Sequence, residues 1–204
     1  MPLDARALTV VAATGLEAGA ARRALPRTVR VLRAGIGATD LPAGPLAGAV
    51  ISCGLAGGVR RDLPTGTVLV PREIEHPDGS RRICDAALVA ALVAGAAALR
   101  SDAVTGILAT SRTLVRGSER TPYAARGVVA VDMESALIDA ERIAAVRVVL
   151  DTPERELSAA WLHPLRVLIE PQAWPELPWL MREGPRCARL AAAVIAQALR
   201  PGAS

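Results

Sequence analysis

The chain has 204 residues, of which 51% are hydrophobic. This length suits one domain over residues 1–204 with a full core, and it is too short for two domains of ordinary size. No apolar run reaches the roughly 18 to 20 residues that span a bilayer, and the first residues show no extended apolar core before a small-residue cleavage site. We therefore expect a cytoplasmic protein without a transmembrane segment. The net charge of +4 is modest, lysine is absent, and the arginine pairs have no aromatic neighbours, so we expect no nucleic-acid partner.

Strand-like and helix-like segments alternate along the chain. Strands are predicted at residues 7–13, 28–32, 49–53, 66–70, 104–109, 128–131 and 146–150, with residues 112–115 extending the sheet. Helices are predicted at residues 16–25, 86–99, 133–145 and 179–199, a hairpin turn at 77–80 and a proline-rich loop at 171–178. This order predicts a three-layer α/β/α sandwich around a mixed, mostly parallel sheet.

Two acidic residues follow buried strands near the middle of the chain: Glu134 and Asp151. With a helix between the two strands, a right-handed crossover would set them parallel, with both carboxyl ends at one edge. Open α/β sheets bind ligands at that edge. We therefore expect Glu134 and Asp151 to share one crevice, where a carboxyl group can hold sugar hydroxyls or donate a proton to a leaving group.

Three glycine-rich strand ends would line the same edge, at Thr14–Gly15, Gly35–Gly37 and Gly54–Gly58. Glycine lets backbone N–H groups approach a ligand closely or form an anion-binding nest. Each segment alone is better explained as a tight turn. Together with the neighbouring segment Asp132–Ser135, the three favour a binding site.

The cysteines and the missing lysine limit the chemistry. Cys53, Cys84 and Cys187 are scattered without a metal-type or disulfide-type pattern. Without lysine, neither a Walker-type phosphate loop nor a lysine Schiff base can form. We therefore expect neither a metal nor an organic cofactor.

Four segments in order resemble the purine nucleoside phosphorylase and nucleosidase superfamily: Gly54–Gly58, Gly66–Val70, Val131–Ser135 and Arg147–Asp151. Within it, the opening Thr14-Gly15-Leu16, the sequence Asp151-Thr-Pro and the tail that starts at Trp174 resemble the hopanoid-associated phosphorylase branch. The resemblance implies an enzyme that cleaves the N-glycosidic bond of a purine nucleoside with an apolar, adenosylhopane-like 5′-substituent. It further implies phosphate as co-substrate and a homodimer or higher homo-oligomer.

The resemblance also assigns roles by position. Glu134 would hydrogen-bond the ribose 2′- and 3′-hydroxyls, and Met133 would pack under the sugar. Asp151 would protonate the purine N7 or donate a hydrogen bond to it, as the catalytic residue that makes the base a better leaving group. Arg147 would restrain a carboxylate or pair with Glu134, and a purely structural ion pair explains it equally well. Further substrate contacts fall on Gly54, Leu55, Ala56, Leu114 and Val115.

The chain departs from the family pattern at both positions that select the nucleophile. Nucleosidases carry a water-activating glutamate on the first helix, which the alignment puts at Gly19. Glu17 lies roughly 200° away around an ideal helix, so we expect it to be a solvated helix-start residue. Phosphorylases carry an arginine and a serine near the third strand, where this chain has Ser52 and Leu55. Phosphate would then rely on Ser52 and on the backbone of Gly15, Gly35 and Gly37, with Arg22 or Arg33.

Two other functions therefore stay open. One is a degenerate relative that binds a nucleoside or adenine without turnover. The other is a methylthioadenosine-type nucleosidase or futalosine-type hydrolase, which Gly19 disfavours. Trp161, Trp174 and Trp179 near the C-terminus suit a core role slightly better than a lid or an oligomer contact.

Overall fold

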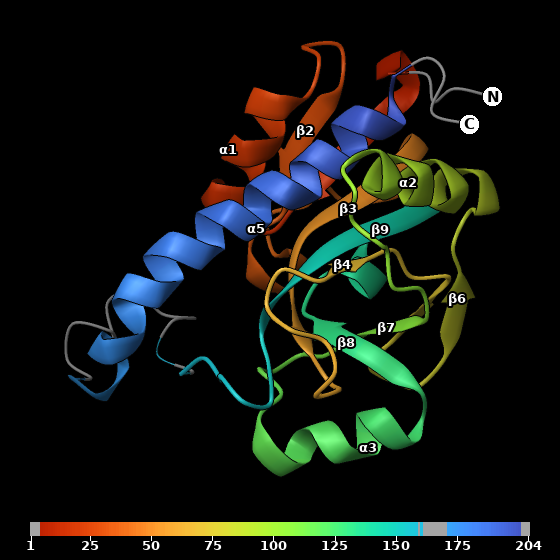
Figure 1. Ribbon diagram of the computed structural model, residues 1–204. Helices are drawn as coiled ribbons and strands as arrows, with labels where there is room; N and C mark the ends of the chain where they lie inside the picture. The colour runs from red at the N-terminus through yellow and green to blue at the C-terminus, as the bar shows by residue number, and fades with distance from the viewer. Residues whose placement is uncertain (1–4, 159, 161–170, 201–204) are drawn as a thin grey trace.

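The computed structural model describes residues 5–158, 160 and 171–200. In these ranges a nine-stranded mixed sheet is flanked by helices (Figure 1), which confirms the predicted α/β class. The strands are β1 (Leu8–Ala12), β2 (Arg30–Arg33), β3 (Leu46–Gly58), β4 (Val68–Leu69), β5 (Glu73–Glu75), β6 (Arg81–Ile83), β7 (Ile107–Thr110), β8 (Val128–Asp132) and β9 (Ala140–Asp151). The α-helices are α1 (Gly15–Ala24), α2 (Ala86–Ala98), α3 (Arg120–Ala125) and α5 (Leu177–Ala198).

The long strand β3 organises the sheet. β1 and β9 both run parallel to β3, with Ile51 opposite Val10 on β1 and Ala144 on β9. β8 joins the end of β3 in the antiparallel direction, with Val131 opposite Gly57. The strand order is β2-β1-β3-β8-β7-β5-β6, and β9 pairs with β3 and β4. Parallel ladders outnumber antiparallel ones, and β5 and β6 form the expected hairpin.

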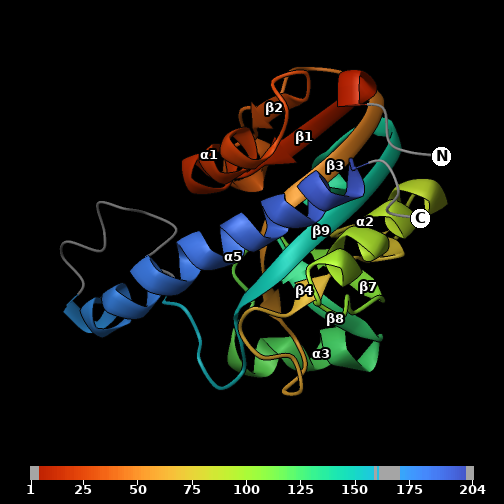
Figure 2. The same ribbon diagram turned by 45° about the horizontal axis from the view of Figure 1, so that its top comes forward.

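Helix α5 crosses the sheet between α1 and α2 and packs on β3 and β9 (Figure 2). Its buried residues recur at helical spacing, as in Cys187, Ala191 and Ile195, so one apolar face meets the sheet. Gly95 on α2 lets the two helices approach closely, because a Cβ there would collide with the carbonyl oxygen of Val194. The N-terminal turns of α5 project past the sheet (Figures 1 and 2).

The helix predicted over residues 133–145 is wrong. A single 3-10 turn, Ser135–Leu137, follows β8, and the chain then enters β9. The alanines that suggested a helix lie on a central strand: Ala144 and Ala145 are fully buried, and small side chains fit where both faces of a sheet are covered. The predicted parallel crossover is wrong too, because β8 runs against β3 while β9 runs with it.

Smaller differences concern residues 112–125 and 171–176. Residues 112–115 form no strand, and α3, which the sequence did not predict, follows them. Residues 171–176, predicted as loop, form a 3-10 helix that leads into α5. Within the described residues, no helix combines the length and apolar character needed to cross a membrane.

Candidate active site

A cavity of about 330 Å³ lies where the carboxyl ends of β1, β3, β8 and β9 meet the first turn of α1. Among the described residues, those that line it with a charged side chain are all acidic: Glu17, Asp132, Glu134 and Asp151. Apolar side chains make up much of the remaining wall, namely Leu16, Ile36, Leu55, Leu114, Leu150, Leu157 and Leu180. A smaller cavity of about 30 Å³ shares Leu114, Met133 and Asp151 with it and also touches Arg120.

The structure places Glu134 and Asp151 on the wall of this one cavity. Glu134 follows the end of β8, and Asp151 is the last residue of β9. Both are buried, with 6% and 4% of their surfaces exposed. The expected geometry is therefore present, although the strands that bring the two carboxyl groups together run in different directions.

Glu134 sits among backbone donors and one cation. Its Oε1 accepts from the N–H of Gly37 at 3.2 Å, and its Oε2 accepts from the N–H of Met133 at 3.3 Å. Burial raises the pKa of Glu134 to about 7, while Arg147 opposes this shift and the nearby Asp132 adds to it. The raised pKa favours the protonated form, which can donate a hydrogen bond, over the carboxylate, which only accepts.

Arg147 is a structural anchor behind the cavity wall. It is 1% exposed and forms an ion pair of 2.7 Å with Asp132, and its distance to Glu134 Oε2 is 3.9 Å. Its Nη2 also donates to the hydroxyls of Ser52 and Ser135 at 2.7 and 3.0 Å. Arg147 and Ser52 are thus sealed from the cavity, and they hold the Asp132–Ser135 turn in place.

Asp151 is held by Arg120. The Arg120 Nη2 donates to Asp151 Oδ2 at 2.6 Å, and Arg120 is itself only 4% exposed. Burial raises the pKa of the Asp151 carboxyl group above its ordinary value, and the Arg120 guanidinium opposes that shift. Among the described residues, no side chain donates a hydrogen bond to Oδ1, and Asp151 lines the cavity.

Glu17 is not the solvated residue that we expected from the sequence. It is 4% exposed and lines the cavity. Thr14 donates to its Oε2 through both its N–H (2.8 Å) and its hydroxyl (2.7 Å), and the N–H of Leu55 donates to its Oε1 at 2.8 Å. The capping box folds the side chain back toward β3, while Gly19, the position the alignment indicated, faces the guanidinium of Arg23.

Gly54 makes room for this arrangement. A Cβ at this position would collide with Glu17 Oε1 and would lie 2.5 Å from Arg147 Nη1. Gly54 therefore lies beneath the site and does not line the cavity, whereas Leu55, Ala56, Leu114 and Met133 do. Val115 borders only the smaller cavity.

The residues predicted to hold phosphate do not assemble into an anion site. The Gly37 N–H already serves Glu134, and neither Gly15 nor Gly35 lines the cavity. Arg33 is exposed and pairs with Asp40 at 3.3 Å, while Arg22 donates to the Val31 carbonyl at 3.3 Å. Among the described lining residues, the larger cavity has no cation.

The sequence contained a signal for Glu17 but none for Arg120. Thr14-Gly-Leu-Glu17 matches the Thr-x-x-Glu capping box, in which the glutamate turns back toward the start of its helix. Arg120 precedes Asp151 by 31 positions and starts a six-residue helix, so only the fold reveals their contact. Asp132 accepts from the backbone N–H groups of Glu134 and Ser135, much as a cap would, but its turn is 3-10.

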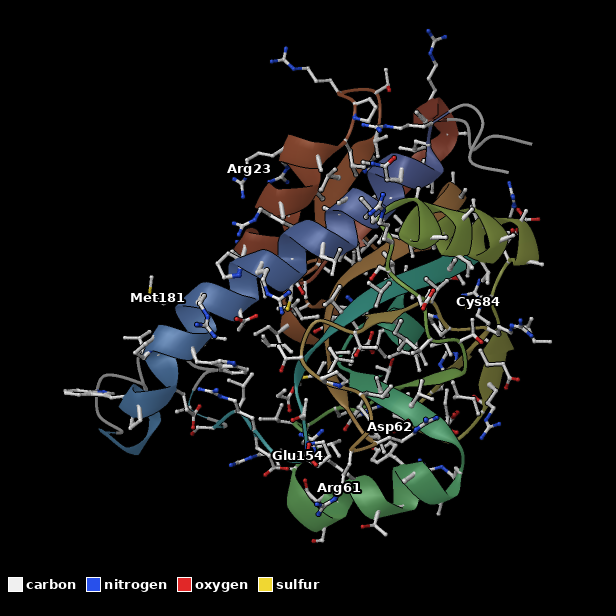
Figure 3. All side chains as sticks on the ribbon, in the orientation of Figure 1. Arg23, Arg61, Asp62, Cys84, Glu154 and Met181 are labelled. Atoms are coloured by element: carbon white, nitrogen blue, oxygen red, sulfur yellow. The ribbon has the colours of Figure 1, made fainter. Side chains whose placement is uncertain are left out.

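The tryptophans differ in environment. Trp179 is 7% exposed and stacks on Arg155, with the guanidinium carbon 4.6 Å from the ring centre. Trp174 is 55% exposed, and Trp161 lies outside the described residues. Met181, on the projecting part of α5, points into solvent (Figure 3).

The sequence match assigns the chain to a protein family. Residues 9–139 match the family model described as the phosphorylase superfamily, and the chain belongs to that superfamily. No curated protein matches the chain significantly.

Solved structures of nucleosidases share the fold. The 5′-methylthioadenosine/S-adenosylhomocysteine nucleosidase of Neisseria meningitidis, in complex with methylthio-immucillin-A, has a TM-score of 0.70 at 17% identity, covering 95% of this chain and 98% of its own. The S-adenosylhomocysteine nucleosidase of Streptococcus pyogenes, in complex with 5-methylthiotubericidin, gives 0.69 at 16% identity over 97% of both chains. The futalosine hydrolase of Helicobacter pylori gives 0.68 at 14% identity, covering 96% of this chain and 97% of its own.

Proposed function

We propose that this protein cleaves the N-glycosidic bond of a purine nucleoside that carries an apolar 5′-substituent, and that water is the nucleophile. The observation that carries the proposal is the convergence of Glu17, Glu134 and Asp151 from α1, β8 and β9 on one cavity. The family match and the nucleosidase fold of the structural neighbours support it.

Each carboxyl group has a role that its surroundings suit. Asp151 donates a proton to the purine N7, for which a pKa raised by burial is favourable. Glu134 binds the ribose hydroxyls. Glu17 accepts a proton from the water that attacks the anomeric carbon, so the products are the free purine and the free sugar. Negative charge in a water-poor cavity stabilises the positive charge that develops on the ribose as the bond breaks.

Phosphorolysis, which the resemblance to the hopanoid-associated branch implies, fits this cavity less well. A phosphate dianion would meet four acidic residues and no cation among the described lining residues. The negative charges of phosphate and of these carboxylates would repel each other strongly in a cavity of low dielectric constant. The Glu17 carboxylate, by contrast, is suited to activating water.

Partly exposed apolar side chains of the cavity are the reason for proposing an apolar 5′-substituent. Leu16 and Ile36 are 41% and 39% exposed, and Leu180 lies beside them on α5. These side chains border the mouth of the cavity and would contact an apolar group attached to the ribose C5′. Among nucleosides with an apolar 5′-substituent, we propose substrates as large as an adenosylhopane-like nucleoside.

Adenine release from adenosine, 5′-methylthioadenosine and adenosines with longer 5′-alkyl groups tests the proposal, with and without inorganic phosphate. We expect release without phosphate and a higher kcat/KM for the apolar 5′-groups. Release that depends on phosphate would instead establish a phosphorylase. Tight adenine binding without release from any of these nucleosides would establish the degenerate relative.

A further inference from the structure

Arg120 is a buried cation at the far end of the candidate site, and the assigned roles leave it without a function. Its guanidinium contacts three acceptors: Asp151 Oδ2 at 2.6 Å, Glu156 Oε1 at 3.2 Å and the carbonyl oxygen of Gly58. Arg120 also lines the smaller cavity next to Asp151. A buried guanidinium in this geometry orients its carboxylate partner and favours the ionised form of that partner.

We infer that Arg120 is a positioning residue for the reaction, fixing the orientation of Asp151 and controlling when that carboxyl group carries its proton. The inference rests on the proposed function, in which Asp151 acts on the purine. Arg120 binds Oδ2, so in the proposed reaction Oδ1 would be the oxygen that acts on the purine. The pairing also means that Asp151 must gain its proton against an adjacent positive charge before it can act as an acid.

Glu156 moderates this effect, because it competes with Asp151 for the same guanidinium. Its Oε1 also accepts from the N–H of Gly117 at 2.6 Å, which anchors the loop that carries Leu114 to the segment after β9. The negative charge of Glu156 raises the pKa of Asp151, whereas the charge of Arg120 lowers it. Removing the charge of Arg120 should therefore raise the pKa of Asp151, and removing the charge of Glu156 should lower it.

Other charged groups face Asp151 from the remaining elements. Asp132 at the end of β8 lines both cavities with it, and Glu134 and Glu17 lie on the wall of the larger one. From β3, Gly57 lies against the Asp151 carboxyl group, and the carbonyl oxygen of Gly58 accepts from Arg120. The variants below leave all of these groups in place.

The experiment is the pH dependence of kcat/KM for adenine release in the wild type, Arg120→Met and Glu156→Gln, with Arg120→Lys as the charge-preserving control. Activity falls on the alkaline side as Asp151 loses its proton. In Arg120→Met this limb should move to higher pH by about one unit or more, the effect typical of an adjacent guanidinium. In Glu156→Gln it should move to lower pH, and in Arg120→Lys it should stay close to that of the wild type.

A purely structural Arg120 would lower activity at every pH without moving the limb, and that result in folded variants would overturn the inference. Should Arg120→Met not fold, Glu156→Gln decides, because Glu156 is partly exposed and its amide still accepts hydrogen bonds. A wild type that binds adenine without releasing it from a nucleoside would refute the proposed function alone. The pH dependence of adenine affinity, measured by calorimetry on the same variants, would then test Arg120 by the same opposite shifts.

Discussion

Glu17→Gln is the sharpest test of whether the cavity activates water. The substitution keeps the shape of the side chain, but an amide has one acceptor oxygen where the carboxylate has two. Glu17 Oε1 serves the N–H of Leu55, while Oε2 serves the N–H and hydroxyl of Thr14. The single amide oxygen of a glutamine can accept either from Leu55 or from Thr14, and its NH₂ group must then face the other residue.

The substitution should affect both stability and turnover. Leaving one buried backbone N–H without an acceptor costs about 1–3 kcal/mol of stability, so the variant should melt at a lower temperature and still fold. Losing the general base should reduce kcat roughly 10²- to 10⁴-fold, which corresponds to about 3–5 kcal/mol of activation free energy. The catalytic loss should therefore exceed the loss of stability.

Thr14→Val is the matched control. It removes the hydroxyl that donates to Glu17 Oε2 at 2.7 Å and retains the carboxylate. It should lose about 1 kcal/mol of stability, as is usual for a lost helix cap, with most of the activity retained. Adenine release and thermal melting are measured on both variants. Wild-type turnover in Glu17→Gln would show that the carboxylate is only a cap.

Three further changes test the rest of the site. Asp151→Asn should reduce adenine release at least about 10²-fold at little cost to folding, because the amide oxygen still accepts from Arg120; full activity would remove Asp151 from the mechanism. The pKa of Glu134 is raised by burial from 4.5 to about 7, so its contribution to stability is complete below pH 4.5 and is lost as pH rises through about 7. Glu134→Gln should consequently weaken turnover while flattening the decline in melting temperature between pH 5 and pH 8, and an unchanged pH–stability curve would contradict the buried setting. Gly54→Ala should cost about 1–3 kcal/mol through overpacking and lower kcat by displacing Glu17 and Arg147, so a variant with normal stability and activity would show that the two side chains move aside freely.

Strands with strong apolar runs could be predicted from the sequence, and the alanine-rich segment after Glu134 could not. The strands at residues 128–131 and 146–150 were predicted correctly because β-branched side chains favour buried strands. Between them, alanine favours a helix in isolation, and only the pairing of β9 with β3 and β4 overrides that preference. Local propensity is a weak guide where tertiary pairing decides the conformation.

In the candidate site, too, some residues could be predicted from the sequence and others could not. Glu134 and Asp151 could be proposed because each lies at or just beyond the end of a recognisable strand. Glu17 was misjudged because the ideal-helix argument placed it by angle, while the capping box bends the side chain back across the helix start. Arg120 reaches Asp151 through space from a short helix, and no spacing in the sequence records that contact.

The convergence of four acidic side chains on one cavity also needs a physical account. Like charges buried together destabilise a fold unless they are paired or protonated, and both remedies are present. Arg147 pairs with Asp132 at 2.7 Å and lies 3.9 Å from Glu134, whose pKa is raised to about 7 so that part of the population is neutral. Asp151 is paired separately with Arg120. Arg147 lies behind the wall and Arg120 at the far end of the site, so the charged residues that line the larger cavity within the described part of the chain are all acidic. In the function that we propose, such a cavity would repel phosphate and stabilise a cationic sugar, so the same arrangement that strains the resting fold would favour hydrolysis of the glycosidic bond.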